Sequence, residues 1–165
     1  MRLEGSCACG SVRFELSSTE PWPYQRCYCS ACRKTAGGGG YCINLGGDAR
    51  SLRVIGSEHV RIFRTHTQRD GRSVASEHER HFCGRCGSHL WAQNPRWPDL
   101  VHPVAGAIDT PLPRPPESVH LMLGSSASWA APAPCSGEAC YDAYPPLSLK
   151  AWHASHGYVE GEPDS

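Results

Sequence analysis

The stretch Cys83-Gly84-Arg85-Cys86-Gly87 decides the fold, together with two cysteine groups that come earlier in the chain. These groups are Cys7-Ala8-Cys9-Gly10 and Cys27-Tyr28-Cys29-Ser30-Ala31-Cys32. A C-x-x-C turn folds back tightly, so both of its sulfurs can lie about 2.3 Å from one tetrahedral zinc ion. A C-x-C segment can do the same, because residues two apart on an extended chain share a face. The spacing therefore predicts metal binding.

Counting ligands divides these cysteines into two predicted zinc sites. The first brings four thiolates, which is typical of a closed structural site, from Cys7, Cys9, Cys83 and Cys86. The second brings three thiolates and leaves one position open, which is typical of a reactive site, from Cys27, Cys29 and Cys32. We expect two zinc ions per chain. The alternative is a single closed site, with the remaining cysteines as free thiols.

Composition and charge limit the possible classes of protein. The 165 residues fit one domain, and 17 glycines with 14 prolines favour a loop-rich β protein over long helices. The formal net charge is zero without a basic stripe, so we expect no nucleic-acid partner. No apolar run approaches the roughly 20 residues that span a bilayer, and the first residues lack a signal-peptide pattern. We therefore expect a cytoplasmic protein without a membrane partner, whose ten cysteines bind metal rather than form a disulfide scaffold.

The pattern of apolar residues predicts a mainly β fold with one or two short helical turns. Asp70-Gly71 is a strong hairpin signal, and Ser30 is a candidate N-cap for a short helix over 30–35. Pro103 indicates an edge strand, because proline cannot donate to a sheet ladder. The expected strands cover 12–16, 41–45, 52–55, 60–64, 74–82, 89–92, 100–104 and 119–123.

The remaining cysteines and the last part of the chain carry weaker signals. Cys42 falls on an expected strand and is predicted to be a small buried residue. Cys135 and Cys140 lie in an Ala/Pro/Gly-rich loop and could bind metal, form a disulfide or remain exposed thiols. We divide the chain into a zinc-binding domain over 1–129 and an extension over 130–165, packed on that domain or trailing from it. Residues 157–165 are expected to fray.

The order of the cysteine motifs resembles that of the glutathione-dependent formaldehyde-activating enzyme family, which includes centromere protein V. The resemblance covers about residues 3–129. It is carried by the runs Gly5-Ser6-Cys7-Ala8-Cys9-Gly10-Ser11-Val12-Arg13-Phe14, Cys27-Tyr28-Cys29-Ser30-Ala31-Cys32-Arg33-Lys34, Phe82-Cys83-Gly84-Arg85-Cys86-Gly87-Ser88-His89-Leu90-Trp91, Val104-Ala105-Gly106-Ala107-Ile108-Asp109 and His120-Leu121-Met122-Leu123-Gly124-Ser125-Ser126-Ala127-Ser128-Trp129.

The resemblance implies a β-tent fold of antiparallel sheets and the same two zinc sites. It also implies an activity, the addition of glutathione to formaldehyde to give S-hydroxymethylglutathione, which is a carbon–sulfur lyase reaction. The catalytic residues would then be Cys27, Cys29 and Cys32, and the partner a small thiol. Arg33, Lys34 and the glycines of 37–40 are candidate substrate contacts. The alternatives are a non-enzymatic zinc-structured binding module and a thiol or metal sensor.

Overall fold

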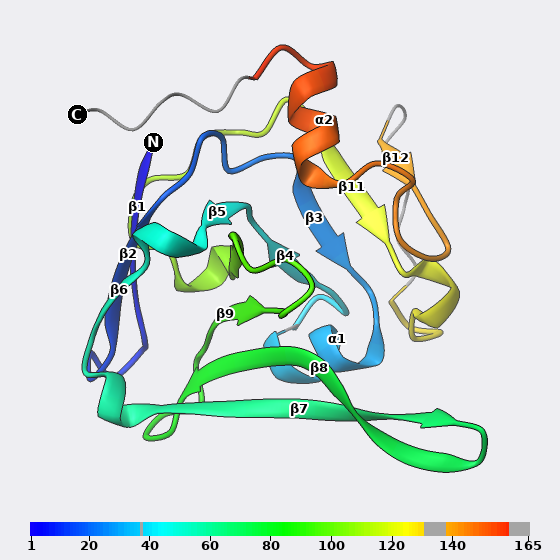
Figure 1. Ribbon diagram of the computed structural model, residues 1–165, viewed down its shortest axis with the longest axis horizontal. Helices are drawn as coiled ribbons and strands as arrows, with labels where there is room; N and C mark the ends of the chain where they lie inside the picture. Colours follow the sequence, from blue (N-terminus) through cyan, green and yellow to red (C-terminus); the bar gives the residue numbers. More distant parts are fainter. Residues whose placement is uncertain (37, 131–137, 159–165) are drawn as a thin grey trace.

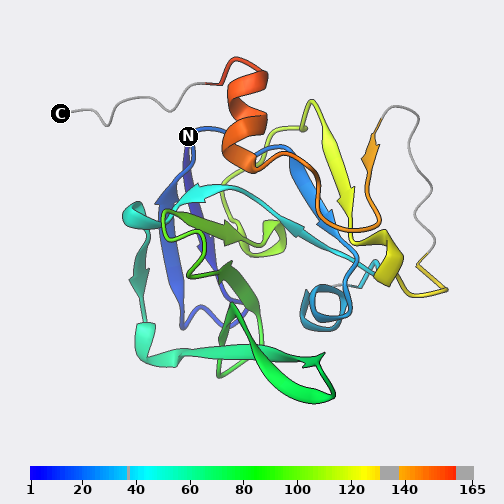
Figure 2. The same cartoon turned by 45° about the vertical axis from the view of Figure 1, so that its right-hand side comes forward.

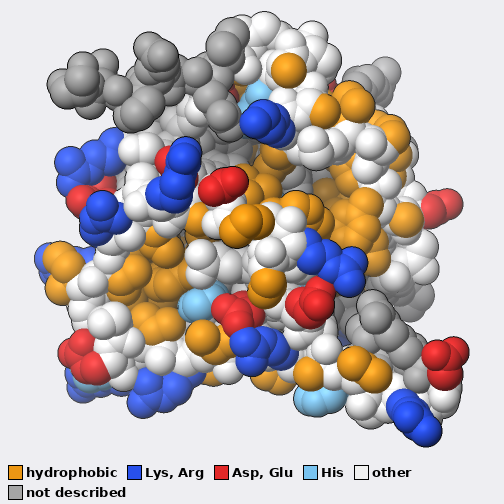
Figure 3. Space-filling model, in the orientation of Figure 1, with side chains coloured by type: hydrophobic (Ala, Val, Ile, Leu, Met, Phe, Trp, Pro, Cys, Tyr) orange, Lys and Arg blue, Asp and Glu red, His pale blue; other side chains and the backbone are white. Residues whose placement is uncertain are grey.

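The computed structural model describes residues 1–36, 38–130 and 138–158, with the side chains of 67–69 left out. The described chain is mainly β, with three sheets and two α-helices, which confirms the predicted fold class (Figure 1, Figure 2). None of its helices is long and apolar enough to cross a membrane. On the face seen in Figure 3, basic and acidic side chains are interspersed, in keeping with the zero formal net charge.

The first sheet is antiparallel and carries one wall of the core. Its strands, in the order β1–β2–β6, are β1 (Arg2–Ser6), β2 (Arg13–Ser17) and β6 (Arg53–Ile55). Apolar and polar residues alternate along β1 and β2, so that Leu3, Phe14 and Leu16 are buried on one face. The turn from β1 to β2 contains Cys7 and Cys9, and the pairing of the two strands fixes where that turn lies.

The second sheet contains the long hairpin at the bottom of Figure 1. Its strands, in the order β5–β10–β9–β8–β7, are β5 (Gly47–Asp48), β7 (Val60–Arg69), β8 (Arg72–Cys83), β9 (His89–Gln93) and β10 (Leu100–Pro103). Asp70 and Gly71 join β7 to β8 with φ of 50° and 73°, as a type I′ turn requires. The predicted hairpin is therefore confirmed.

The third sheet brings distant parts of the chain together. Its strands, in the order β12–β11–β3–β4, are β3 (Tyr24–Cys27), β4 (Cys42–Asn44), β11 (Ser118–Leu121) and β12 (Ala139–Cys140). Only the β3–β4 pair is antiparallel, whereas β11 runs parallel to both β3 and β12. Long connections separate these parallel strands in sequence, so no hairpin dictates their direction.

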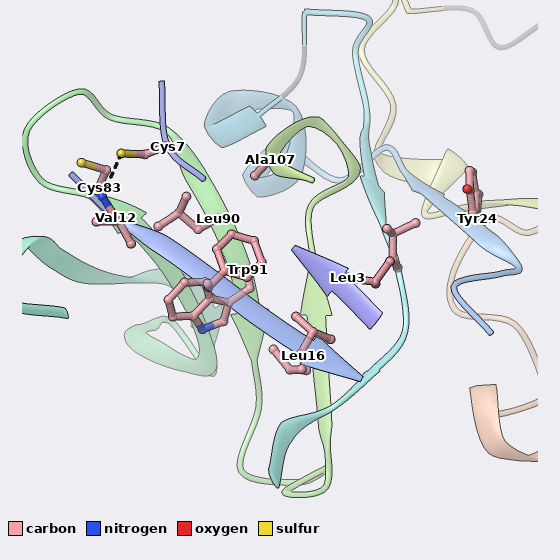
Figure 4. Packing of buried hydrophobic residues seen from close by; sticks show 12 residues of the cluster. Leu3, Cys7, Val12, Leu16, Tyr24, Cys83, Leu90, Trp91 and Ala107 are labelled. Carbon is pink, nitrogen blue, oxygen red and sulfur yellow. Dashed lines mark hydrogen bonds between the residues drawn. The ribbon is translucent and has the colours of Figure 1, made fainter. Parts of the chain in front are cut away.

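The main hydrophobic core lies between the first and second sheets (Figure 4). Trp91 of β9 packs against Phe14 with ring centroids 5.2 Å apart. His81 of β8 stacks on the same indole, with ring centroids 5.0 Å apart. Cys7 and Cys83 close one end of this core, near Leu90 in Figure 4. The four-cysteine cluster is thus built onto the rim of the core.

Two local features differ from the expectations. Helix α1 (Ser30–Ala36) begins at Ser30 itself, so Ser30 is its first residue rather than its N-cap. The edge prediction from Pro103 is wrong, because β10 lies between β5 and β9. Proline is tolerated at this last residue of the strand because β5 pairs with β10 only at Leu100 and Val101, so the missing N–H removes no bond of that ladder, and the Pro103 carbonyl accepts from the Leu45 N–H at 2.9 Å.

Helix α2 (Leu149–Ser155) was not expected. Ser148 caps it by accepting a hydrogen bond from the Ala151 N–H, and Trp152 is the buried residue of the helix. His153 bonds the carbonyl of Trp22 through Nε2, at 2.7 Å, so α2 packs on the body of the protein. Of the expected frayed segment, residues 159–165 lie outside the described part of the chain.

Candidate metal centre

The cysteine motifs converge into two separate groups, each with its sulfur atoms within 4.8 Å of one another. One group is Cys7, Cys9, Cys83 and Cys86, and the other is Cys27, Cys29 and Cys32. Either group could hold a metal ion. The structure thus brings together the same residues that ligand counting grouped.

The four-cysteine cluster joins the turn after β1 to the turn after β8. The Cys9 sulfur lies 3.5 Å from the Cys7 sulfur and 3.8 Å from the Cys83 sulfur. Gly87 adopts a φ of 78° at the close of the C-x-x-C turn, a conformation that favours glycine. Across more than seventy residues of sequence, the Ala8 N–H donates to the Ser88 hydroxyl at 3.1 Å and ties the two turns together.

Half of this cluster is buried and half is exposed. Cys7 and Cys83 are buried in the core, whereas Cys9 and Cys86 face solvent. The hydroxyl and backbone of Ser88 lower the pKa of the Cys86 thiol to about 5. Burial acts in the opposite direction on Cys83 and raises its pKa to about 11. The exposed thiols therefore ionise first and can start metal capture, because the thiolate is the ligand form.

The three-cysteine cluster is built from the end of β3 and the first turn of α1. Cys27 is the last residue of β3, and Cys32 lies inside α1. The backbone N–H of Cys32 donates to the Cys29 sulfur at 3.4 Å, which holds the C-x-x-C turn closed. Cys27 and Cys32 are buried, and Cys29 is half-buried. All three belong to, or pack against, a second apolar cluster with Cys42 and Val104.

Ionisation within the three-cysteine cluster is uneven. Hydrogen bonds from the Cys27 and Cys32 thiols lower the pKa of Cys29, and the positive charge of Arg80 contributes in the same direction. The hydrogen bonds to Cys29 and Cys32 raise the pKa of Cys27, and burial adds to that rise. Of the three thiols, Cys29 is therefore the first to ionise, and the hydrogen bonds from Cys27 and Cys32 stabilise its thiolate.

A buried hydrogen-bond chain supports the turn between Cys27 and Cys29. The Tyr28 hydroxyl lies 3.0 Å from Nδ1 of His120, and Nε2 of His120 lies 2.7 Å from a Glu138 oxygen. Tyr28 and His120 are buried and their rings stack. These hydrogen bonds anchor the C-x-C segment to β11, so the positions of its sulfurs depend on a strand more than ninety residues away in sequence.

Sequence reasoning missed a buried charged residue that acts on the three-cysteine cluster. Arg80 of β8 is only 6% exposed, and its charge lowers the pKa of Cys29. Arginine is almost never fully buried unless it is paired. Arg80 lies in the polar stretch over 74–82, but nothing in that stretch indicates which face of the strand is buried. Tyr144, whose pKa is raised by desolvation and then by the charges of the three cysteines, was missed as well.

The other predicted residues take varied positions. Cys42 is buried on β4, as expected. Arg33 is half-buried and Lys34 exposed on the last turn of α1, near Cys32. The nine cysteines of the described residues are all free of disulfide bonds. Cys140 is exposed and joins neither cluster, whereas Cys135 lies outside the described residues.

The comparison with protein families gives a clear match over most of the chain. The model of the family described as glutathione-dependent formaldehyde-activating enzyme matches residues 2–124. The chain belongs to this family. All seven clustered cysteines lie within the matched residues, so the family match and the two clusters describe the same part of the molecule.

Two known proteins extend the comparison. A protein of Halomonas elongata is 55% identical over 161 residues, which cover 98% of this chain and 100% of that protein. Its name is "Putative glutathione-dependent formaldehyde-activating enzyme". The crystal structure of a Rhodobacter sphaeroides protein covers 86% of this chain and 99% of its own, with a TM-score of 0.50. Because the two sequences are 21% identical, this likeness supports the fold alone.

Proposed function

We propose that this chain is a zinc-dependent carbon–sulfur lyase that joins a small thiol of the glutathione type to an aldehyde such as formaldehyde. The observation that carries the proposal is the three-cysteine cluster, Cys27, Cys29 and Cys32, whose sulfurs lie within 4.8 Å of one another. Three protein ligands leave one tetrahedral position for a ligand from outside. The family match supports the thiol as that ligand.

The donor atoms fit zinc at both clusters. Thiolate sets of three or four sulfurs select soft or borderline metals such as zinc, and four sulfurs suit a tetrahedral structural site. We assign the structural zinc to Cys7, Cys9, Cys83 and Cys86, and the reactive zinc to the trio. When bound at the trio, zinc supplies a position at which an incoming thiol is held as its thiolate.

The residues around the trio would position the substrate. The trio lies at the start of α1, and Arg33 and Lys34 follow Cys32 on the same helix. Their positive charges can hold a carboxylate of a glutathione-like thiol. Tyr28 keeps the C-x-C segment in place through its bond to His120. Placing thiol and aldehyde together supplies the orientation that their reaction needs.

The test is thiol-dependent turnover with and without an intact trio. Glutathione and ¹³C-formaldehyde are mixed, and the approach of the adduct signal to equilibrium is followed by NMR, with the uncatalysed rate subtracted. Partners one step removed from a metal already change activity by about 10- to 100-fold, so Cys29→Ser should lose at least that much. Cys140→Ser removes an exposed thiol outside both clusters and is the matched control.

Three outcomes would separate the proposal from its alternatives. Acceleration that Cys29→Ser retains in full contradicts the role of the trio. Glutathione binding without acceleration would instead indicate a binding module. Reversible loss of the trio's zinc under mild oxidation, without thiol binding, would indicate a sensor.

A further inference from the structure

The guanidinium of Arg80 is buried beside the three-cysteine cluster without the partners that such a group needs. Arg80 is only 6% exposed. The Nε and Nη1 atoms of its guanidinium have no hydrogen-bond partner among the described residues. These two nitrogens carry most of the N–H groups of the guanidinium. An uncompensated buried charge is costly, so its retention calls for a partner that completes it.

The strand register shows which side of the second sheet Arg80 occupies. Arg80 of β8 stands opposite Ala92 of β9, and Ala92 stands opposite His102 of β10. Residues that face each other in this way share one face of a sheet. The next row, His81 and Trp91, packs into the main core through the contact of Trp91 with Phe14. Arg80 therefore lies on the opposite face.

That opposite face is the one near the trio. Figures 1 and 2 both show α1, which carries Cys32, next to β8. Hydrogen bonds from the neighbouring thiols lower the pKa of Cys29, and the charge of Arg80 contributes to that fall; at Cys42 the same charge opposes the rise in pKa that burial causes. The guanidinium therefore acts on Cys29, just before α1, and on Cys42 of β4. We therefore treat the three cysteines and the guanidinium of Arg80 as parts of one site.

The histidines around Arg80 do not complete its hydrogen bonding. Burial, followed by repulsion from Arg80, lowers the pKa of His78 and of His89 to about 4. Both rings are therefore neutral at pH 7, and Arg80 is the positive charge of this group. His102 already directs its Nδ1 to the Leu45 carbonyl, at 3.0 Å. Among these side chains, Arg80 remains the one with unused charged donors.

The charge of Arg80 and its donors have different consequences. Three thiolates on a divalent ion leave a net charge of about −1, which the positive charge of Arg80 balances. Charge balance alone leaves the N–H groups of Nε and Nη1 without acceptors. Planar, forked donors suit an oxygen that carries negative charge. In the proposed reaction, such an oxygen arises next to the trio.

We propose that Arg80 is a catalytic residue that binds the aldehyde oxygen as it gains negative charge. In this step the thiolate sulfur forms a bond to the carbonyl carbon, and the C=O π pair moves onto the oxygen. The oxygen then takes a proton from water, which replaces the proton that the thiol released. The product is the S-hydroxymethyl adduct, a hemithioacetal, and no oxidant or reductant is needed. The inference rests on the proposed function, and it assigns the second substrate to the Arg80 side of the trio.

The kinetic test separates binding of the thiol from chemistry. Loss of one oxyanion donor lowers kcat by about 100- to 1000-fold in other enzymes, and we expect this range for Arg80→Met. The count of two zinc ions per chain and the Kd of glutathione, from isothermal titration, are measured beside kcat, and both should stay within about threefold of wild type in Arg80→Lys, which keeps the balancing positive charge. Arg80→Lys keeps the positive charge without the planar fork of donors, so its kcat should lie between those of wild type and Arg80→Met.

A second readout uses binding without turnover. S-acetylglutathione carries an oxygen on the carbon next to sulfur, whereas S-ethylglutathione lacks it. Wild type should prefer the acetyl compound by about tenfold, the typical effect of one hydrogen bond to a charged group, and Arg80→Met should lose that preference. Arg64→Met is the matched control, because Arg64 is half exposed and pairs with Glu79 on the face of the hairpin opposite Arg80, so this variant should behave as wild type.

The outcomes are distinct. An unchanged kcat in Arg80→Met, or a fall in kcat of Arg80→Lys that only follows loss of zinc or of glutathione binding, overturns the inference. If Arg80→Met does not fold, Arg80→Lys decides, and wild-type kcat together with an intact acetyl preference in that variant contradicts the role of the fork. A wild-type protein without turnover refutes the proposed function first, and the role of Arg80 in that reaction with it.

Discussion

The two cysteine clusters differ in what surrounds them, although their ligands are chemically alike. The four-cysteine cluster lies at the rim of the apolar core, with Cys7 and Cys83 buried and Cys9 and Cys86 open to solvent. The three-cysteine cluster is more buried, and the charge of Arg80 contributes to lowering the pKa of its Cys29. Thiolate count and surroundings change together, so one cluster is suited to holding strands and the other to holding a reactant.

The largest effect is expected at the four-cysteine cluster. Structural zinc contributes about 10–16 kcal/mol of apparent binding free energy, which matches or exceeds the roughly 5–15 kcal/mol of net stability of a domain. Cys86→Ala should therefore unfold the chain, and strong chelation should do the same. Because Cys86 is exposed, the variant removes a ligand without leaving a large cavity.

Circular dichroism and thermal melting check this prediction. Cys140→Ala, at an exposed thiol outside both clusters, should melt like wild type. A cooperative wild-type melt of Cys86→Ala would show that the four-cysteine cluster is dispensable for folding.

The next effect separates the clusters by metal removal. A mild chelator should remove the zinc of the three-cysteine cluster first, because the protein supplies only three ligands there and four at the other cluster. Turnover should then be lost while the circular dichroism spectrum remains native. Metal content and activity are measured on the same samples during the titration. Simultaneous release of both ions, with unfolding, would contradict the difference between the clusters.

A smaller effect tests the buried polar side of the trio. Burial holds the pKa of His89 at about 4, below its value of about 6.5 in unfolded chains. The unfolded state therefore binds more protons between these values, so the stability from neutral His89 is complete above pH 6.5 and is lost as pH falls through 4. The full difference is about 3 kcal/mol.

Urea unfolding at several pH values measures this loss. His89→Gln should show a shallower fall in the free energy of unfolding between pH 6.5 and 4 than wild type. Equal slopes in both proteins would mean that His89 is not held neutral in the folded state.

The smallest effect concerns the support of the C-x-C segment. Tyr28→Phe removes the hydroxyl that bonds His120 and leaves a buried nitrogen without its partner, at a cost of about 1–3 kcal/mol. It should also weaken zinc binding at the trio alone. Tyr24→Phe is the control, since its hydroxyl bonds Pro113 away from both clusters, at 2.7 Å. Equal zinc affinity in the two variants would remove the link between Tyr28 and the trio.

Much of the site was predictable from sequence because cysteine spacing is a local constraint. The C-x-C and C-x-x-C segments fix sulfur positions within one turn, and Asp70-Gly71 fixes one hairpin in the same way. The position of Arg80 was not predictable. It depends on the register of three strands and on an irregularity in the pairing of β8 with β9 after His81, which no short motif records.

Two other outcomes have similar physical causes. Helix α2 is short and follows a proline pair, so its apolar pattern was too brief to predict it, although Ser148 is a suitable cap. Pro103 was placed at an edge because a missing N–H excludes proline from the middle of a ladder, but β5 pairs with β10 only at Leu100 and Val101 and leaves Pro103 outside that ladder. In both places the outcome depends on contacts with distant parts of the chain, which rules for short stretches of sequence do not include.

The most direct test of the account is isothermal titration of glutathione into two preparations of the same protein, one with two zinc ions per chain and one from which mild chelation has removed a single ion. The account predicts one glutathione bound per chain in the first preparation and none in the second, with both folded. Equal binding in the two preparations would contradict the claim that the three-cysteine cluster holds the thiol.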